Sequence, residues 1–150
     1  DRFDRSVESC SQKKYPETKK LRQVGGVGPL VVLAYVLTLG DHKRFRRSRD
    51  VGAYVELVPK EKSSGQCRPQ MRITKAGNRY LRQLLVTSAH YILSSRSEDS
   101  ALRRHGLKIA DRGGKNAKKR AVVAVARKLS VVLHRLWASD RDYQPLQGIV

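Results

Sequence analysis

Acidic residues are scarce in this sequence, and the few present are scattered. It contains 13 Asp and Glu residues against 32 Lys and Arg residues. Enzymes that cut nucleic acids with divalent metals need convergent carboxylates, and no such grouping stands out. Glu56 and Glu61 flank one loop, but two carboxylates without a third are more typical of surface charge. We therefore predict no metal site and no bound cofactor in this chain.

Cysteine and aromatic residues are also sparse. Cys10 and Cys67 stand alone, with no Cys-x-x-Cys pair and no His at ligand spacing, so neither a zinc site nor a disulfide framework is indicated. One Trp and two Phe leave little aromatic surface for a membrane-binding helix. Four His residues without paired spacing are expected to be ordinary surface or core residues: His42, His90, His105 and His134.

The sequence also lacks a long hydrophobic run. The longest, Pro29 to Leu39, has 11 residues with Thr38 inside it, whereas roughly 20 are needed to span a bilayer. The first residues, 1–5, show no signal-peptide pattern and no initiator Met, so we expect a longer protein that continues before Asp1. A cytoplasmic protein with reduced thiols is the default expectation.

What the chain has in excess is positive charge. A formal net charge of +19 causes self-repulsion that is most readily tolerated when the partner is a polyanion, so nucleic acid is the leading candidate. A length of 150 residues allows one domain with a real core. We expect this domain at 21–143, preceded at 1–20 by the tail of a helix or a linker, and followed by a frayed tail at 144–150.

Apolar periodicity predicts a mostly α-helical fold with at most short strands around one loop. Residues 29–39 are apolar nearly all round, which predicts a buried helix that Gly40 ends. Two further helices are expected after Thr74 and over 117–138. Their apolar faces are Leu81, Leu84, Leu85, Ser88, Ala89 and Ile92, and Val122, Val125, Ala126, Leu129, Val132, Leu133 and Leu136. The basic, Gly-containing stretch 103–120 predicts a flexible connection that could order on nucleic acid.

Two glycines mark a turn before the first buried helix. Gly26 and Gly28 flank Val27, and Pro29 suits the first turn of a helix. This pattern predicts a helix-hairpin-helix turn, in which backbone N–H groups at a helix N-terminus approach a phosphate closely. A plain corner between two helices fits the same residues, because a lone Gly-x-Gly is weakly specific. Gly26 and Gly28 are thus candidate DNA contacts.

A run of cations follows at residues 42–49. It holds five Lys or Arg residues and no acid, with Phe45 as the expected anchor to the core. Such a run is commonly a solvated face, and at this net charge a phosphate-facing patch fits equally well.

The stretch from Pro59 to Arg82 combines a Ser63-Ser64-Gly65 turn, a cluster of cations and a helix start. A serine hydroxyl that attacks a phosphodiester forms a covalent link that conserves the bond for rejoining, and cations must stabilise the pentavalent phosphate. An ordinary surface turn fits the same serines. The candidate nucleic-acid contacts here are Arg68, Arg72, Lys75, Asn78, Arg79 and Arg82.

Short motifs follow one another along roughly residues 20–143 in a specific order. They are Gly25–Gly28, Gly40–Asp41 with Phe45, Ala53–Val55, Leu57–Pro59, Ser63–Gly65, Ile73–Asn78 with Leu81–Arg82, Ala117–Lys119, Val125–Leu129 and Tyr143. This order resembles the C-terminal transposase domain of the bridge-RNA-guided insertion-sequence transposases. Members of that family pair a RuvC-like acidic domain with a serine-bearing domain.

The resemblance implies that Ser64, directly before the glycine, is the nucleophile for DNA cleavage and rejoining, with Ser63 as second choice. It also implies Mg²⁺ held by the acidic domain, a composite active site, and a homo-oligomer on DNA with a guide RNA. The setting would be the bacterial cytoplasm, in association with the nucleoid. This chain holds none of that acidic domain, so we expect it to be unable to recombine DNA by itself.

Some positions depart from the family pattern. Glu56 stands where Gly is common, Gly25 stands where Pro is common, and the segment after Gly65 is poorer in Gly. The alternative function is therefore a non-catalytic remnant that binds nucleic acid through the hairpin and the basic loops.

Overall fold

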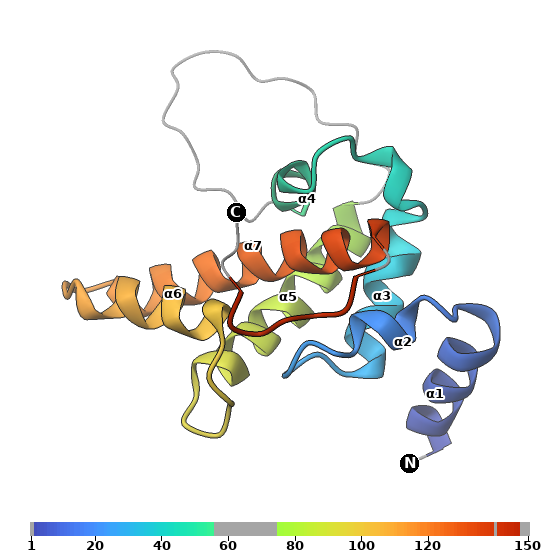
Figure 1. The fold of residues 1–150 in the computed structure, drawn as a ribbon, viewed down its shortest axis with the longest axis horizontal. Coiled ribbons are helices and arrows are strands. Elements are labelled where there is room, and N and C mark those ends of the chain that lie inside the picture. Colours follow the sequence, from blue (N-terminus) through green and yellow to red (C-terminus); the bar gives the residue numbers. More distant parts are fainter. Residues whose placement is uncertain (1, 56–74, 140, 148–150) are drawn as a thin grey trace.

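The computed structural model of the chain describes residues 2–55, 75–139 and 141–147, and for 75–78 it describes the backbone alone. Within these residues the chain forms seven α-helices and one 3-10 helix, with no strand (Figure 1). The prediction of a mostly α-helical fold is confirmed. The predicted short strands around the serine loop lie outside the described residues.

The N-terminal part consists of α1 (Arg2–Lys14), α2 (Thr18–Leu21) and α3 (Pro29–Leu39). Pro29 occupies the first turn of α3, and Gly40 ends it with φ +78°, as predicted. The side chains of α3 are buried on several sides because it packs against α1, α2 and α5. On α1, Val7 is buried while most other residues are exposed. This short helix therefore rests on the core by a narrow apolar edge.

A short 3-10 helix, η1 (His42–Arg44), and α4 (Arg49–Tyr54) follow α3. The Asp41 carboxylate accepts a hydrogen bond from the Lys43 backbone N–H at 2.9 Å, which caps η1. Both elements pack against the last helix of the chain.

The three remaining helices are α5 (Lys75–Leu93), α6 (Ala101–Asp111) and α7 (Ala117–Ala138). The α7 helix is central, because α2, η1, α4, α5 and α6 all pack against it (Figure 1). Its bounds match the predicted 117–138. Every residue of its predicted apolar face is buried: Val122, Val125, Ala126, Leu129, Val132, Leu133 and Leu136. On α5, Leu84 alone of the predicted face is half-buried rather than buried.

The α6 helix corrects the sequence prediction, which made residues 103–120 a flexible connection. Ser100 caps this helix, its Oγ accepting from the Arg103 backbone N–H at 3.0 Å. Leu102 and Gly106 are buried, and the helix lies along α7. Of its three Lys or Arg residues, Arg104 and Lys108 are exposed, whereas Arg103 is half-buried. The basic, Gly-containing composition of this stretch therefore led to a wrong prediction, although the helix packs extensively along α7.

The segment after α7 returns across the molecule through residues 141–147 (Figure 1). The Tyr143 N–H donates to the Gln23 side-chain oxygen at 2.8 Å, and the Ala101 N–H donates to the Pro145 carbonyl at 2.7 Å. The described end of the chain is thus joined to the N-terminal part and to α6. None of the described helices has the length and apolar character needed to cross a membrane.

Candidate nucleic-acid interface

The predicted nucleophiles belong to residues 56–74, here named the serine segment. Ser63, Ser64, Arg68 and Arg72 lie outside the described residues, as do the side chains of Lys75 and Asn78. The structure describes the helices on either side. The serine segment follows α4 and leads into α5, and both of these helices pack against α7. One helix therefore supports both flanks of the predicted site.

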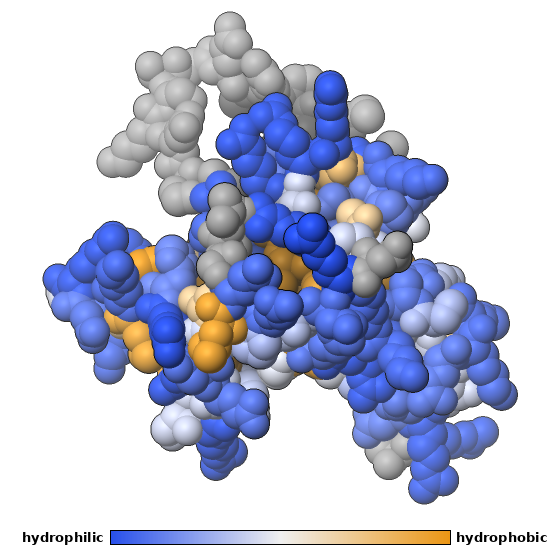
Figure 2. Space-filling model, viewed as in Figure 1, coloured by the Kyte–Doolittle hydropathy of each residue, from blue (hydrophilic) through white to orange (hydrophobic). Residues whose placement is uncertain are grey.

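Residues 42–49, here named the basic arm, lead into this site. The Phe45 ring packs on the core and lies edge-on to the rings of Tyr54 and His134, at centroid distances of 5.1 and 6.0 Å. The predicted anchor is thus confirmed. The cations that this anchor leaves exposed are Lys43, Arg44, Arg46, Arg47 and Arg49. Figure 2 shows the surface around η1 and α4 as predominantly hydrophilic.

Arg44 is held more tightly than the other cations of the arm. Its Nη1 donates to the Leu39 carbonyl at 2.6 Å, and its guanidinium carbon lies 5.5 Å from the centre of the Tyr54 ring. A cation at this distance from an aromatic face is attracted to it. Arg44 therefore closes the end of α3 in addition to adding charge to the arm.

A buried histidine holds the arm against α7. His134 is 3% exposed; Ser48 Oγ lies 2.7 Å from its Nδ1, and the His42 carbonyl lies 2.8 Å from its Nε2. A carbonyl can only accept, so Nε2 carries the proton and Nδ1 accepts from the Ser48 hydroxyl. The prediction of an ordinary core histidine covers the burial of His134. It did not foresee that the ring connects both ends of the arm, because residues 42, 48 and 134 meet only in the fold.

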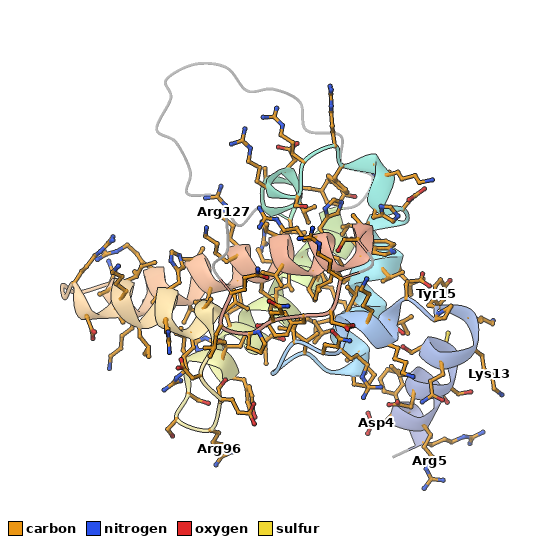
Figure 3. The ribbon with its side chains drawn as sticks, viewed as in Figure 1. Asp4, Arg5, Lys13, Tyr15, Arg96 and Arg127 are labelled. Carbon is orange, nitrogen blue, oxygen red and sulfur yellow. The ribbon has the colours of Figure 1, made fainter. Side chains whose placement is uncertain are left out.

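The α7 helix adds one cation that the sequence reasoning missed. Gly52 of α4 lies against the stem of Arg127, so closely that a Cβ at position 52 would be 2.9 Å from Arg127 Cγ. Figure 3 shows Arg127 reaching from α7 toward the side of α4. Its guanidinium thus joins the face that carries the basic arm. The only sequence signal was an arginine beside the predicted apolar face of this helix.

Two predicted contacts on α5 lie at its beginning. Arg79 is exposed and Arg82 is partly exposed. Their predicted approach to the serine loop stays a prediction, because that loop lies outside the described residues.

The two glycines of the predicted helix-hairpin-helix turn before α3 differ in their surroundings. Gly26 has φ +88°, and a Cβ there would lie 2.9 Å from Tyr91 Cδ1 and 3.3 Å from Ile92 Cγ1. Glycine is therefore required at position 26 for backbone conformation and packing on α5. Gly28 has an extended backbone at the N-cap of α3, with open space where a Cβ would stand. Of the two candidate DNA contacts, Gly28 is the one that a phosphate could reach without competing with packing.

Acidic and metal-binding groups are sparse around these elements. Among the residues that the structure describes, no group of three or more His, Cys, Asp or Glu side chains is placed to hold a metal ion. Within the basic arm and α4 the nearest ion pair is a long one, Arg47 Nε to Asp50 Oδ2 at 3.9 Å, between exposed side chains. Exposed pairs of this kind contribute little stability and leave the surface cationic.

Several known proteins are similar to this chain. A transposase for insertion sequence element IS1111A of Coxiella burnetii is 32% identical over 133 residues, which cover 88% of this chain and 36% of that protein. A Pseudomonas aeruginosa protein named as a probable family 20 transposase is 30% identical over 128 residues, covering 85% of this chain and 37% of its own length. A transposase for IS1328 of Yersinia enterocolitica is 38% identical over 71 residues, or 47% of this chain and 21% of that protein.

The chain spans little more than a third of the first two of these relatives. Residues 18–105 match the sequence profile described as the transposase IS116/IS110/IS902 family. This match runs from α2 into α6 and includes the glycine turn before α3, the basic arm and the serine segment. The chain therefore belongs to the IS116/IS110/IS902 family of transposases.

Proposed function

We propose that this chain is the DNA-binding catalytic domain of an insertion-sequence transposase and that Ser64 supplies its nucleophile. The observation that carries the proposal is the family match, which spans the serine segment. The Ser64 oxygen would attack the scissile phosphorus while the bond to the leaving sugar oxygen breaks. The serine proton passes to a base or water, and the leaving oxygen takes up a proton. Attack by a hydroxyl of the new strand would then release the serine.

The cations around α4 and α7 support this role. A pentavalent phosphate carries negative charge that cations aimed at it stabilise. The exposed cations of the basic arm and the half-buried Arg127 lie on the side of α7 where α4 leads into the serine segment. Phosphate contacts of this kind position DNA without reading its sequence. We assign the same task to Arg68, Arg72, Lys75, Asn78, Arg79 and Arg82.

The complete reaction belongs to the longer protein. We propose an N-terminal RuvC-like acidic domain, a guide RNA and a homo-oligomer on DNA as its further parts. Mg²⁺ would be held by that acidic domain, where it would stabilise charge on the phosphate and the leaving oxygen. Among the described residues of this chain, no cluster of side chains fits Mg²⁺.

The nucleophile is tested with Ser64→Ala in the full-length protein. We expect the covalent protein–DNA adduct, measured on a denaturing gel, to disappear, and strand exchange to fall by at least about a thousandfold, as expected for loss of a nucleophile. Ser63→Ala is the matched control and should keep both. Strand exchange that survives Ser64→Ala would show that the assignment is wrong.

A non-catalytic remnant is the second candidate function, favoured by Glu56 in place of the glycine common in the family. Such a protein would bind DNA with a steep salt dependence, because backbone contacts release counterions. It would form no adduct even with Ser64 intact. Adduct formation by the wild-type full-length protein therefore separates the two candidates.

The predicted DNA contact at the glycine turn before α3 is tested with Gly28→Ala. A methyl group there enters open space, so the free energy of unfolding should change little. If the backbone N–H groups at Gly28 bind a phosphate, the added methyl group should keep the phosphate at a distance, and loss of about 1 kcal/mol of hydrogen bonding should weaken DNA binding roughly fivefold. Gly26→Ala is unsuitable because it collides with Tyr91. Unchanged affinity in Gly28→Ala would eliminate the hairpin contact.

A further inference from the structure

The α6–α7 hairpin, residues 101–128, carries a concentration of positive charge away from the serine segment. It contains ten Lys or Arg residues and one acid, Asp111. Most of it lies beyond residue 105, where the family match ends. The hairpin tip forms one end of the long axis of the molecule, with α1 toward the other end (Figure 1). Apart from Arg127, which lies against α4, this surface is thus distinct from the basic arm in both sequence and position.

Part of this charge is used within the fold. Arg103 donates to the carbonyls of Ile92 and Ser94, and Arg104 pairs with Asp99. Arg120 donates to the Gly113 carbonyl at 3.5 Å, and the stem of Arg127 lies against Gly52. Within the described residues no ion pair reaches the six other cations, which are exposed except for the half-buried Lys128: Lys108, Arg112, Lys115, Lys118, Lys119 and Lys128. Figure 2 shows hydrophilic residues together with several hydrophobic ones at this end of the molecule.

Three of these cations, from both helices, act electrostatically on the imidazole of His105. Partial burial lowers the pKa of His105, and the charges of Lys128 on α7 and of Arg112 and Lys108 beside α6 lower it further. No carboxylate offsets this effect, although Asp111 lies nearby in the sequence. Cations from both helices thus act on one region of the hairpin, and a cluster of cations favours the binding of an anion.

The residue types of the hairpin indicate which polyanion it fits. Residues 101–136 contain no Phe, Tyr or Trp. Binding of single-stranded nucleic acid relies on aromatic side chains that stack on bases, so this surface lacks the usual platform for a single strand. The hairpin exposes only two large apolar residues among its described positions, Leu107 and Val123, compared with ten Lys or Arg residues. Two such residues form no broad apolar interface. Lysines and arginines alone suit the phosphate backbone of a duplex.

We propose that the α6–α7 hairpin binds the phosphate backbone of duplex DNA next to the site of cleavage, through Lys108, Arg112 and Lys128. The choice of DNA rests on the proposed function, whereas the choice of a duplex rests on the residues of the hairpin. The contact would hold the flanking duplex while the serine segment acts on the scissile phosphate.

The test compares two triple variants of the 150-residue chain that remove equal charge. One is Lys108→Gln, Arg112→Gln and Lys128→Gln. The control is Arg5→Gln, Lys13→Gln and Lys14→Gln on the exposed side of α1, where Figure 3 shows Arg5 and Lys13. Binding to a fluorescent DNA duplex is measured from about 50 to 200 mM salt, a range over which backbone contacts change affinity strongly. Thermal unfolding followed by circular dichroism checks that both variants fold.

The hairpin variant should bind about tenfold more weakly, and the slope of log affinity against log salt should fall by about 2 to 3, near 0.9 for each lost phosphate contact. The α1 variant should lose less than about threefold by the same reasoning. Equal losses in both variants would overturn the inference, because net charge would then account for everything. Tighter hairpin-dependent binding to an RNA duplex of the same sequence, or to a single strand, would overturn the choice of duplex DNA.

The result is separable from the fate of the proposed function. If Ser64 is not the nucleophile, the wild-type full-length protein forms no adduct or Ser64→Ala keeps it, while the difference between the two triple variants persists. If the hairpin inference is wrong, the two triple variants behave alike while the full-length protein still forms its Ser64 adduct.

Discussion

The two parts of α7 behave as different kinds of helix. In the C-terminal part, residues 129–136, every residue except Arg135 is buried, including the polar Ser130 and His134. In the N-terminal part, residues 117–128, burial follows a stripe, and five of the seven remaining residues are Lys or Arg. The difference arises from the neighbours. Several elements enclose the C-terminal part, whereas the N-terminal part lies beside α6 and presents its outer side to solvent.

The enclosed part tolerates polar groups only because each has a partner. The buried Tyr35 hydroxyl, 0% exposed, donates to the Ser130 carbonyl at 2.7 Å, and burial raises the pKa of Tyr35. His134 is satisfied by Ser48 and His42. One helix thus serves as core at one end and as a charged surface at the other. The contrast can be tested with paired substitutions.

The largest effect is expected in the enclosed part. Leu133 is 0% exposed, so Leu133→Ala should lower the free energy of unfolding by about 2–5 kcal/mol through lost burial and a cavity. Val123 in the open part is 40% exposed, and Val123→Ala should change the free energy of unfolding by less than about 0.5 kcal/mol. Urea denaturation measures both. Equal destabilisation would remove the distinction between the two parts of α7.

The next effect concerns the polar link to the basic arm. Ser48→Ala leaves the buried Nδ1 of His134 without its partner, which should cost about 1–3 kcal/mol of unfolding free energy. Ser95→Ala, at an exposed position, is the control. Urea denaturation again provides the measurement. A Ser48→Ala protein as stable as the control would mean that packing, rather than this hydrogen bond, holds the arm.

A smaller effect is expected where α6 meets α7. Gly106 has no room for a side chain, since a Cβ would lie 2.5 Å from Val125 Cγ2 and also against Leu93. Overpacking costs about 1–3 kcal/mol, and removing a helical glycine returns about 1, so Gly106→Ala should destabilise the fold by about 1 kcal/mol. The thermal midpoint from circular dichroism measures the change. A stabilised variant would show that the hairpin is more loosely packed than described.

The smallest effect is a pH dependence in the open part of the molecule. The pKa of His105 in the folded chain lies below its usual value of 6.5. Below pH 6.5 the unfolded chain therefore takes up the proton more readily, and stability falls as the pH drops. The urea midpoint of the wild type should thus decrease more than that of His105→Gln between pH 7.5 and 5.5. Identical decreases would mean that neither burial nor the three cations lower the pKa of His105 in solution.

The sequence predicted those elements whose signals are local. Apolar composition and flanking residues gave α3, with Pro29 in its first turn and Gly40 at its end. Period 3.6 gave α7, because its buried stripe continues along the whole helix. The α6 helix was missed because charged residues outnumber the buried ones that attach it to α7. The domain limits at 21–143 and the roles of the serine segment remain predictions.

The sequence by itself determined the helical class, the excess of positive charge and the order of motifs typical of the family; its choice of Ser64 remains a prediction. Those properties depend on residue type and on short spacings. Only the tertiary structure decided that His134 joins both ends of the basic arm, that Gly26 packs on Tyr91 while Gly28 stays open, and that cations from two helices meet at His105. Each of these depends on residues far apart in the chain, which helix packing brings within a few ångströms.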